Sequence, residues 1–177
     1  MLSIDDLYLP HNQQEALAKT HPHNPLVQHR GQPSTHDIAL GKELFTSIRN
    51  RHSNIKIPSY DKSAFNGQGD RRATNDWETI NDASSTQKVE VVIFEGWCVG
   101  YRSLSEEELR RKWEQAKAAA EDGAAYKGQL GKLQFDSVQF VNEALKEYDA
   151  LTKYVVTHYK STFTDKTFSQ LDAFMHM

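Results

Sequence analysis

The chain contains 177 residues, of which 21 are lysine or arginine and 24 are aspartate or glutamate, and its formal net charge is −3. Acidic and basic residues are intermixed, whereas nucleic-acid binding calls for a basic stripe. No apolar run approaches the about 20 residues that cross a bilayer, and the first residues lack the basic and apolar parts of a signal peptide. We therefore expect a cytoplasmic protein with one domain over residues 1–177 and no nucleic-acid or membrane partner.

The composition is low in apolar residues. Hydrophobic residues make up 38% of the chain. Counting Gly in place of Tyr gives roughly 39%, below the about 45–50% of typical soluble proteins. A surface-rich chain, or one that lacks some buried strands, has such a composition. The only cysteine, Cys98, cannot form an intrachain disulfide, which fits a reducing compartment.

The first part of the chain predicts short elements. Residues 2–4 fit the end of a buried strand, and residues 11–20 fit a short polar helix. Asp37 begins a better helix, because apolar residues follow it at helical spacing. Residues 55–57 form a strand that ends at a proline. Residues 59–87 are rich in Gly, Asn, Asp and Ser and predict mostly loop.

The second part predicts one long strand and two helices. Residues 89–94 are mostly β-branched, which indicates a fully buried parallel strand. Ser105 and Glu108 form a capping box at the start of a helix that reaches Gly123. A further helix from Val138 to Tyr148 is expected to be capped by Asp136. Strands that alternate with helices favour a parallel α/β sheet.

The end of the chain is ambiguous. Residues 171–177 fit either a helix end or a buried strand, because periodicity cannot decide over so few residues.

Carboxylates follow two of the predicted strands. Asp5 and Asp6 come directly after the first strand, and Glu95 ends the strand over residues 89–94. Open α/β sheets bind ligands at the carboxyl ends of their strands, where a carboxylate can take a proton or hold Mg²⁺. The simpler interpretation is that Asp5 or Asp6 only caps the following turn. Two carboxylate sites on neighbouring strands favour the functional interpretation.

Two polar segments join positive charges to turns. The segment from Arg30 to Asp37 combines a positive charge, a turn and a helix start, which suits an anionic or polyhydroxyl ligand. The segments around Lys62 and Arg71 place charges in glycine-containing loops, where the backbone can approach a ligand. A plain turn with a helix cap, and solvated surface loops, explain each segment separately just as well.

Taken in order, five motifs resemble the glycerate 3-kinase-like proteins of fungi and plants. The motifs are Ser-Ile-Asp-Asp-Leu-Tyr, Arg-Gly-x-Pro-x-Thr-His-Asp, Pro-x-Tyr-Asp-Lys-Ser, Gly-x-Gly-Asp-Arg and Val-Val-Ile-Phe-Glu-Gly-Trp. These proteins are P-loop kinases similar to uridine kinase, phosphoribulokinase and bacterial pantothenate kinase. The resemblance is dense from Ser3 to about Tyr101 and looser in residues 141–148 and 172–176. Ser34 stands where the family has glycine.

The resemblance implies a three-layer parallel α/β fold of the P-loop kinase type and ATP-dependent phosphorylation of a hydroxyl group on a small sugar acid such as glycerate. ATP and Mg²⁺ are the implied cofactors. Asp5 is implied as the base, with Asp6 beside it and Glu95 near the metal, which Asp5 and Glu95 would hold. The implied residues of the acceptor site are Arg30, His36, Asp37, Tyr60, Lys62, Asp70 and Arg71. Lys62 and Arg71 suit a substrate carboxylate, because both keep their charge.

The phosphate-binding loop that such a kinase needs is missing. No G-x-x-x-x-G-K-[ST] motif occurs in the sequence, and neither Gly41-Lys42 nor Gly131-Lys132 is followed by Ser or Thr. In the family this loop and its strand precede Ser-Ile-Asp-Asp, and the family continues past a strand resembling residues 172–176. We therefore expect a partial P-loop kinase domain that lacks the P-loop strand and is truncated at both ends.

Other interpretations follow from the same residues. A non-catalytic interaction or regulatory remnant of such a kinase would keep the acceptor half without nucleotide binding, and a product without function is a third reading. His21 and His23 invite a metal site, but Pro22 stiffens the pair and no Cys/His partner has finger-like spacing. Cys98 follows a buried strand and is expected to pack in the core.

Overall fold

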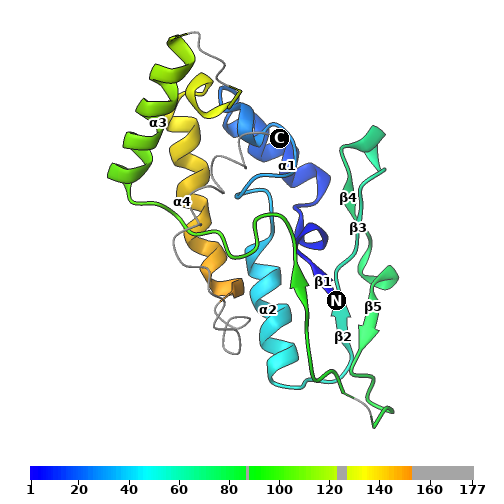
Figure 1. Ribbon diagram of the computed structural model, residues 1–177. Helices are drawn as coiled ribbons and strands as arrows, with labels where there is room; N and C mark the ends of the chain where they lie inside the picture. The colour runs from blue at the N-terminus through cyan, green and yellow to red at the C-terminus, as the bar shows by residue number, and fades with distance from the viewer. Residues whose placement is uncertain (87, 123–126, 153–177) are drawn as a thin grey trace.

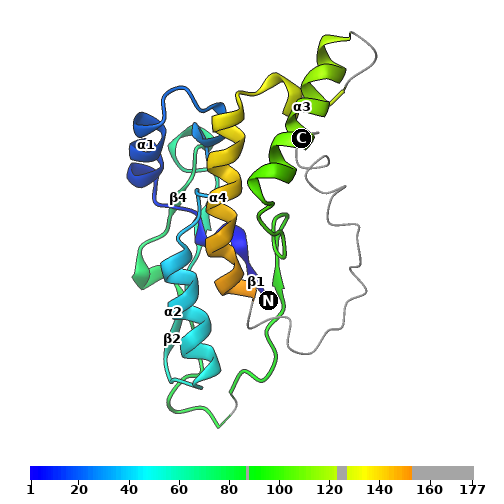
Figure 2. The ribbon, with the colours of Figure 1, turned by 90° about the vertical axis from the view of Figure 1, so that its left-hand side faces the viewer.

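The computed structural model describes residues 1–86, 88–122 and 127–152, which form an α/β structure (Figure 1). The helices are α1 (His11–Thr20), α2 (Ile38–Arg49), α3 (Glu106–Glu121) and α4 (Phe135–Thr152). The strands are β1 (Leu2–Ser3), β2 (Ile55–Ile57), β3 (Tyr60–Asp61), β4 (Asp70–Arg71), β5 (Glu78–Ile80) and β6 (Phe94–Glu95). Helix α4 lies between α3 on one side and α1 and α2 on the other (Figure 2). The expected segment over residues 171–177 lies outside the described residues.

The strands of the described part pair two by two. β1 and β6 are parallel, with Leu2 opposite Phe94 and Ser3 opposite Glu95. β2 pairs antiparallel with β5, and β3 with β4. The α/β class and the parallel pairing are therefore confirmed, while the described residues do not form a larger sheet.

The predicted strand over residues 89–94 is wrong in extent, because only Phe94 and Glu95 are in a strand. Val91 is 79% exposed and Ile93 is 62% exposed. The short strand β1 offers two residues for pairing, and no other described strand pairs with this segment. A β-branched run needs partner strands and a covering layer to become a buried strand, and the described residues supply only the two-residue β1 as a partner.

The predicted helices are present, with one changed cap. Asp37 caps α2 through a hydrogen bond from the Leu40 N–H to its Oδ1 at 2.9 Å. The Ser105 hydroxyl accepts a hydrogen bond from the Glu108 N–H at 3.2 Å, as the capping box predicts. Helix α4, however, begins at Phe135, so Asp136 lies in its first turn and does not cap it. An acidic residue there still interacts favourably with the helix dipole.

The polar segment over residues 59–87 is more ordered than the prediction of mostly loop. It contains β3, β4 and β5 together with two single 3-10 turns at Phe65–Gly67 and Thr74–Asp76. The strands are only two or three residues long, so they show no period-2 pattern that a sequence could reveal. The strand at residues 55–57 is confirmed as β2.

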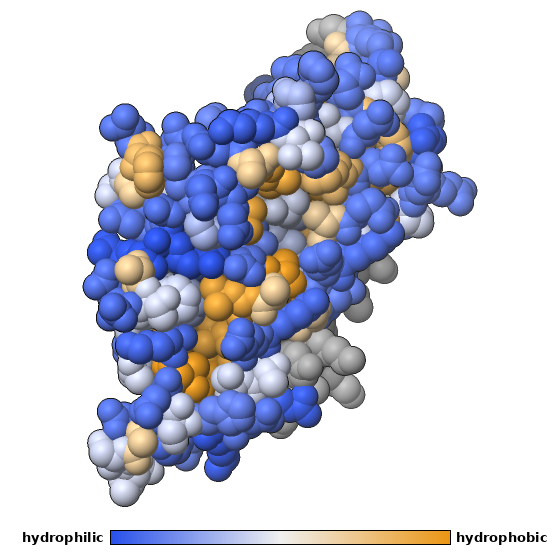
Figure 3. Space-filling model, turned by 180° about the vertical axis from the view of Figure 1, so that it is seen from behind, coloured by the Kyte–Doolittle hydropathy of each residue, from blue (hydrophilic) through white to orange (hydrophobic). Residues whose placement is uncertain are grey.

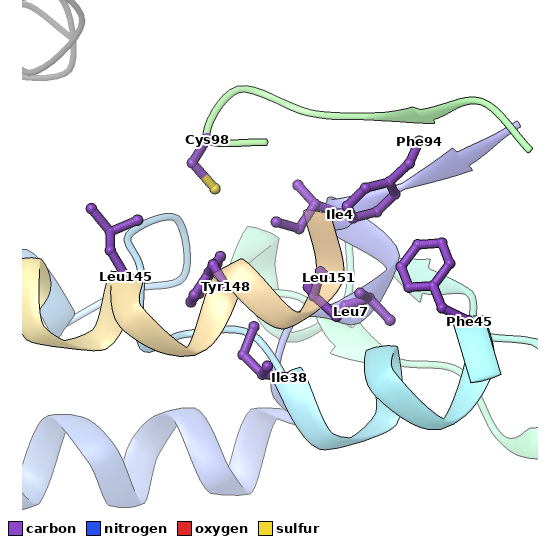
Figure 4. Close-up of a cluster of buried hydrophobic side chains, with 9 residues drawn as sticks. All are labelled: Ile4, Leu7, Ile38, Phe45, Phe94, Cys98, Leu145, Tyr148 and Leu151. Carbon is purple, nitrogen blue, oxygen red and sulfur yellow. The ribbon is translucent and has the colours of Figure 1, made fainter. Parts of the chain in front are cut away.

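One hydrophobic cluster joins β1, β6, α2 and α4 (Figure 4). Its buried members are Ile4, Leu7, Ile38, Phe45, Phe94, Cys98, Leu145, Tyr148 and Leu151. Cys98 is 1% exposed, which confirms its expected place in the core. A second cluster, Leu109, Leu130, Phe135 and Val138, joins α3 to α4. These clusters fix the helices relative to the carboxyl ends of β1 and β6.

The face of the molecule that lies behind the view of Figure 1 carries hydrophobic residues at its surface. Seen from behind, they form a strip across the middle of the molecule between hydrophilic margins (Figure 3). None of the helices in the described residues is long and apolar enough to cross a membrane.

Candidate functional site

Three carboxylates lie at the carboxyl ends of the parallel strands. Ser3 lies opposite Glu95, and the 3-10 turn Ile4–Leu7 follows at once with Asp5 and Asp6. Burial raises the pKa of Asp6, and the neighbouring charges of Asp5 and Glu95 raise it further, against the opposing effect of the Tyr60 N–H. The expected gathering of carboxylates at this edge is therefore present in the structure.

Asp5 forms an ion pair with Lys62, which the sequence motifs had implied as a residue of the acceptor site. Its Oδ2 accepts a hydrogen bond from the Lys62 ammonium at 2.6 Å. The Lys62 side chain is 59% exposed and can move, whereas that of Asp5 is 25% exposed. The other carboxylate oxygen of Asp5, Oδ1, is buried without a hydrogen-bond partner among the described residues. An unpaired buried carboxylate oxygen is costly, so it indicates a place where a ligand or water donates a hydrogen bond.

A cavity of about 450 Å³ opens over this pair. It is lined by Asp5, Tyr8, His29, Arg30, Lys62, Asn66, Gly67 and Gln68. Arg30 donates from Nη1 to the carbonyl oxygens of Gly67, at 2.6 Å, and Gln68, which ties the two loops together at the rim. The cavity thus combines one carboxylate with two cations, a suitable lining for a small molecule that carries a hydroxyl and an acid group.

Tyr60 stands at the side of this arrangement. Its ring is 5.8 Å from the Arg30 guanidinium carbon, and its backbone N–H donates to Asp6 Oδ1 at 3.1 Å. Gly69 packs so closely that a Cβ there would lie 2.5 Å from the Tyr60 ring. Burial raises the pKa of the Tyr60 hydroxyl, which has no partner among the described residues. Tyr60 therefore holds the two loops together and offers one hydroxyl group nearby.

Asp70 and Arg71 have structural contacts and line a different cavity, of about 590 Å³. The Asp70 Oδ1 accepts hydrogen bonds from the N–H groups of His11 and Arg71, both at 2.8 Å, so it caps the start of α1. The Arg71 Nη1 lies 3.0 Å from the Asp37 Oδ2, and its Nη2 donates to the Tyr8 carbonyl at 2.8 Å. The structure thus places Lys62, but not Arg71, beside Asp5.

His36 is buried behind the cavity. Its side chain is 4% exposed, its Nδ1 lies 2.7 Å from the Tyr148 hydroxyl, and its ring stacks on Tyr8 at 4.3 Å between centroids. Burial lowers the pKa of His36 from its usual 6.5 to about 3, although the charge of Asp5 opposes this effect. His36 is therefore neutral at physiological pH.

This burial predicts a loss of stability in mild acid. Between pH 6.5 and 3 the unfolded chain binds a proton at His36 that the folded chain does not bind, so stability falls as the pH falls. From pH 7 to pH 5 we expect this residue to lower the free energy of unfolding by about 2 kcal/mol. Urea denaturation at both pH values measures the loss. His36→Gln should abolish this part of it, whereas His52→Gln, at an exposed position, should keep it; an unchanged loss in His36→Gln contradicts the prediction.

The described residues contain no group of three or more His, Cys, Asp or Glu side chains that could hold a metal ion. Mg²⁺ makes smaller demands, because it keeps several waters and takes one or two carboxylates together with substrate phosphates. Asp5 has a free carboxylate oxygen and Glu95 is exposed at the end of β6. These two residues therefore fit the oxygen ligands that Mg²⁺ takes.

Several lining residues could not be named from the sequence. His29 and Asn66 line the cavity but lie just outside the motifs, whereas Gly67 and Gln68 belong to the Gly-x-Gly-Asp-Arg motif without having been named as site residues. Tyr148 reaches His36 across 112 positions of sequence and was visible only as one apolar position on a helix face. Ser34, at the position of the family's glycine, has φ of 90°, a left-handed conformation that favours glycine.

Comparisons with known proteins confirm the resemblance. No known family's sequence profile matches the chain. It is 46% identical over 103 residues to the uncharacterized kinase mug58 of Schizosaccharomyces pombe and 36% identical over 107 residues to the probable ATP-dependent kinase TDA10 of Saccharomyces cerevisiae. Each match covers 58% of this chain and 36% or 34% of the relative, so the chain spans about a third of their length.

A solved structure agrees with these relatives. The D-glycerate 3-kinase of Cryptococcus neoformans matches with a TM-score of 0.73 and 30% sequence identity, over 86% of this chain and 50% of that one. The relatives are thus named kinases, as the motifs implied, and the arrangement of helices around a parallel pair of strands is shared with a glycerate kinase.

Proposed function

We propose that this chain is the acceptor-binding part of an ATP-dependent kinase, which transfers phosphate to a hydroxyl group of a small sugar acid such as glycerate. The observation that carries the proposal is the cavity of about 450 Å³ in which Asp5 lies 2.6 Å from Lys62, with Arg30 at the rim. A base and two cations in one cavity suit a ligand with one reactive hydroxyl and one carboxylate. The named kinases among its relatives supply the class of reaction.

In the proposed reaction, the acceptor carboxylate takes Lys62 and Arg30 as its partners, and Lys62 leaves Asp5. Asp5 then accepts the proton of the acceptor hydroxyl. The acceptor oxygen forms a bond to the γ-phosphorus of ATP while the bond from that phosphorus to the β,γ-bridging oxygen breaks. Mg²⁺, held by Glu95 and Asp5, would neutralise charge on the phosphates. Arg30 and Lys62 also orient the acceptor, because both can donate hydrogen bonds from more than one nitrogen-bound hydrogen.

We also propose that the chain is part of a three-layer parallel α/β fold of the P-loop kinase type. The likeness to the glycerate kinase structure supports this fold. The 177 residues contain no glycine-rich phosphate loop. Gly41 lies in α2, where a Cβ would be 2.7 Å from Leu151, and a Cβ on Gly131 would be 2.2 Å from the Ala116 carbonyl oxygen. The glycine of each Gly-Lys pair is therefore packed closely against other residues. This observation favours, as a second candidate, a regulatory protein that binds the acid without ATP.

Calorimetric titration of the 177-residue chain, shown to be folded by circular dichroism, separates these functions. Saturable binding of D-glycerate supports the acceptor site, and no binding by a folded chain rejects it. Mg-ATP is titrated next. If the 177-residue chain binds the acid but not ATP, both the kinase part and the regulatory protein remain possible. A phosphorylation assay of the full-length protein then decides between these two functions. The cytoplasmic location remains a prediction.

Lys62→Gln should weaken the binding of D-glycerate by about 10- to 100-fold, because a charge-assisted hydrogen bond to the acceptor carboxylate is lost. Calorimetry measures the dissociation constant. Lys56→Gln is the matched control, since Lys56 donates to the Trp77 carbonyl at 3.3 Å and does not line the cavity. Equal dissociation constants for the two variants would remove Lys62 from the acceptor site.

A further inference from the structure

Tyr148 connects α4 to the loop between Arg30 and Asp37. Its hydroxyl lies 2.7 Å from the His36 Nδ1 and accepts a hydrogen bond from the Ser34 N–H at 3.1 Å. The side chain is 3% exposed and lies within the main hydrophobic cluster (Figure 4). The contact with Ser34 also holds this serine at its φ of 90°. A buried hydroxyl among apolar side chains depends on such partners.

These contacts select one tautomer of His36. The backbone N–H of Ser34 donates to the Tyr148 oxygen at 3.1 Å. Among the described residues the His36 Nδ1, at 2.7 Å, is the acceptor within hydrogen-bond distance of the buried hydroxyl proton, so we assign the hydroxyl as the donor and Nδ1 as the acceptor. A neutral imidazole has one donor and one acceptor nitrogen, so the proton of His36 is on Nε2.

The Nε2 of His36 has no hydrogen-bond partner among the described residues, although His36 is only 4% exposed. The Asp5 Oδ1 is likewise buried without a partner. Asp5 is close enough to His36 for its charge to act on the imidazole, and Tyr8, which stacks on His36, has its hydroxyl within hydrogen-bonding reach of the Asp5 carboxylate. A buried donor and a buried acceptor with no direct bond are what one ordered water joins.

We propose that Tyr148 is a positioning residue for the reaction: it fixes His36 as the Nε2–H tautomer, and this N–H orients the carboxylate of Asp5 through one buried water. The inference rests on the proposed function, in which Asp5 is the base. A chain of three side chains from α4 to the cavity holds the Oδ1 of Asp5 still through one of its two lone pairs, and the other stays available to the Mg²⁺ that Asp5 and Glu95 would hold. The Oδ2 then remains the oxygen that exchanges Lys62 for the acceptor hydroxyl.

The first test is nitrogen NMR of the histidine rings in the 177-residue chain, which needs no turnover. We expect the wild-type His36 to be protonated on Nε2 alone. Tyr148→Phe, which removes only the hydroxyl, should give a mixture of both tautomers, and Asp5→Asn should shift the Nε2–H resonance without changing the tautomer. A proton on Nδ1 in the wild type, an unchanged tautomer in Tyr148→Phe, or an unmoved Nε2–H resonance in Asp5→Asn overturns the proposal.

The second test keeps Tyr148 in place, so it also decides if Tyr148→Phe fails to fold. His36→Gln places an amide near the former Nε2, whereas His36→Asn places it near the former Nδ1. In the full-length protein we expect His36→Gln to keep kcat within about threefold and His36→Asn to lower it about 10-fold or more, with KM for the acceptor little changed. The reverse order, or equal losses, overturns the proposal. Absence of wild-type kinase activity would reject the proposed function instead, while the NMR result still decides the role of Tyr148.

Discussion

Under the proposed function, Asp5→Asn should lower the turnover of the full-length protein by at least about 10²-fold, because an amide cannot take the proton of the acceptor hydroxyl. The affinity for the acceptor should stay the same or improve, since the change removes a negative charge beside the place of the acceptor carboxylate. The two quantities are measured as kcat for the ATP-dependent phosphorylation of D-glycerate and as the dissociation constant by calorimetry. A fall in kcat without weaker binding is the signature of a group that acts in the transition state.

Asp61→Asn is the matched control for this variant. Asp61 is also paired with a cation, since its Oδ2 lies 3.2 Å from the Arg72 Nη2, but it does not line the cavity. Loss of an ion pair as such would lower the activity of both variants. We expect full activity in Asp61→Asn, and near-normal turnover in Asp5→Asn would remove Asp5 from the mechanism.

The helices could be predicted from local signals, whereas most of the strands could not, with β2 as the exception. Asp37 and Ser105 each bond to an N–H three residues ahead, so the start of α2 and of α3 is written in neighbouring residues. The segment from Val89 to Phe94 has strand-forming residues, but a strand exists only where a partner pairs with it. Strand pairing depends on residues far away in the sequence, here the two residues of β1. No local pattern contains that information.

In the site, too, the sequence could predict the type of residue but not the partner that it contacts. The order of strand and carboxylate was sufficient to place Asp5, Asp6 and Glu95 at one edge. It could not tell which cation faces Asp5, because Lys62 and Arg71 stand in similar polar loops. Their partners lie 57 and 34 residues away, and only the folded chain decides between them.

Arg71→Ala should lower the free energy of unfolding by about 2–4 kcal/mol. The Arg71 side chain is 12% exposed and binds both the Asp37 carboxylate and the Tyr8 carbonyl. Its removal leaves these acceptors partly buried without their donor, which is the costly way to break an ion pair. The loss should stay below that of a fully buried pair, because the Asp37 side chain is 25% exposed. Urea denaturation at pH 7 measures it.

The neighbouring arginine supplies the matched control. The Arg72 side chain is 50% exposed and its partner Asp61 is 33% exposed, so Arg72→Ala should change the stability by at most about 1 kcal/mol. Binding of D-glycerate then separates the two roles open to Arg71. If Arg71 positions the backbone, Arg71→Ala loses stability, and its remaining folded fraction binds the acid almost normally. If it binds the acceptor carboxylate directly, stability is kept and affinity falls as in Lys62→Gln, which would move the acceptor toward the cavity beside α1.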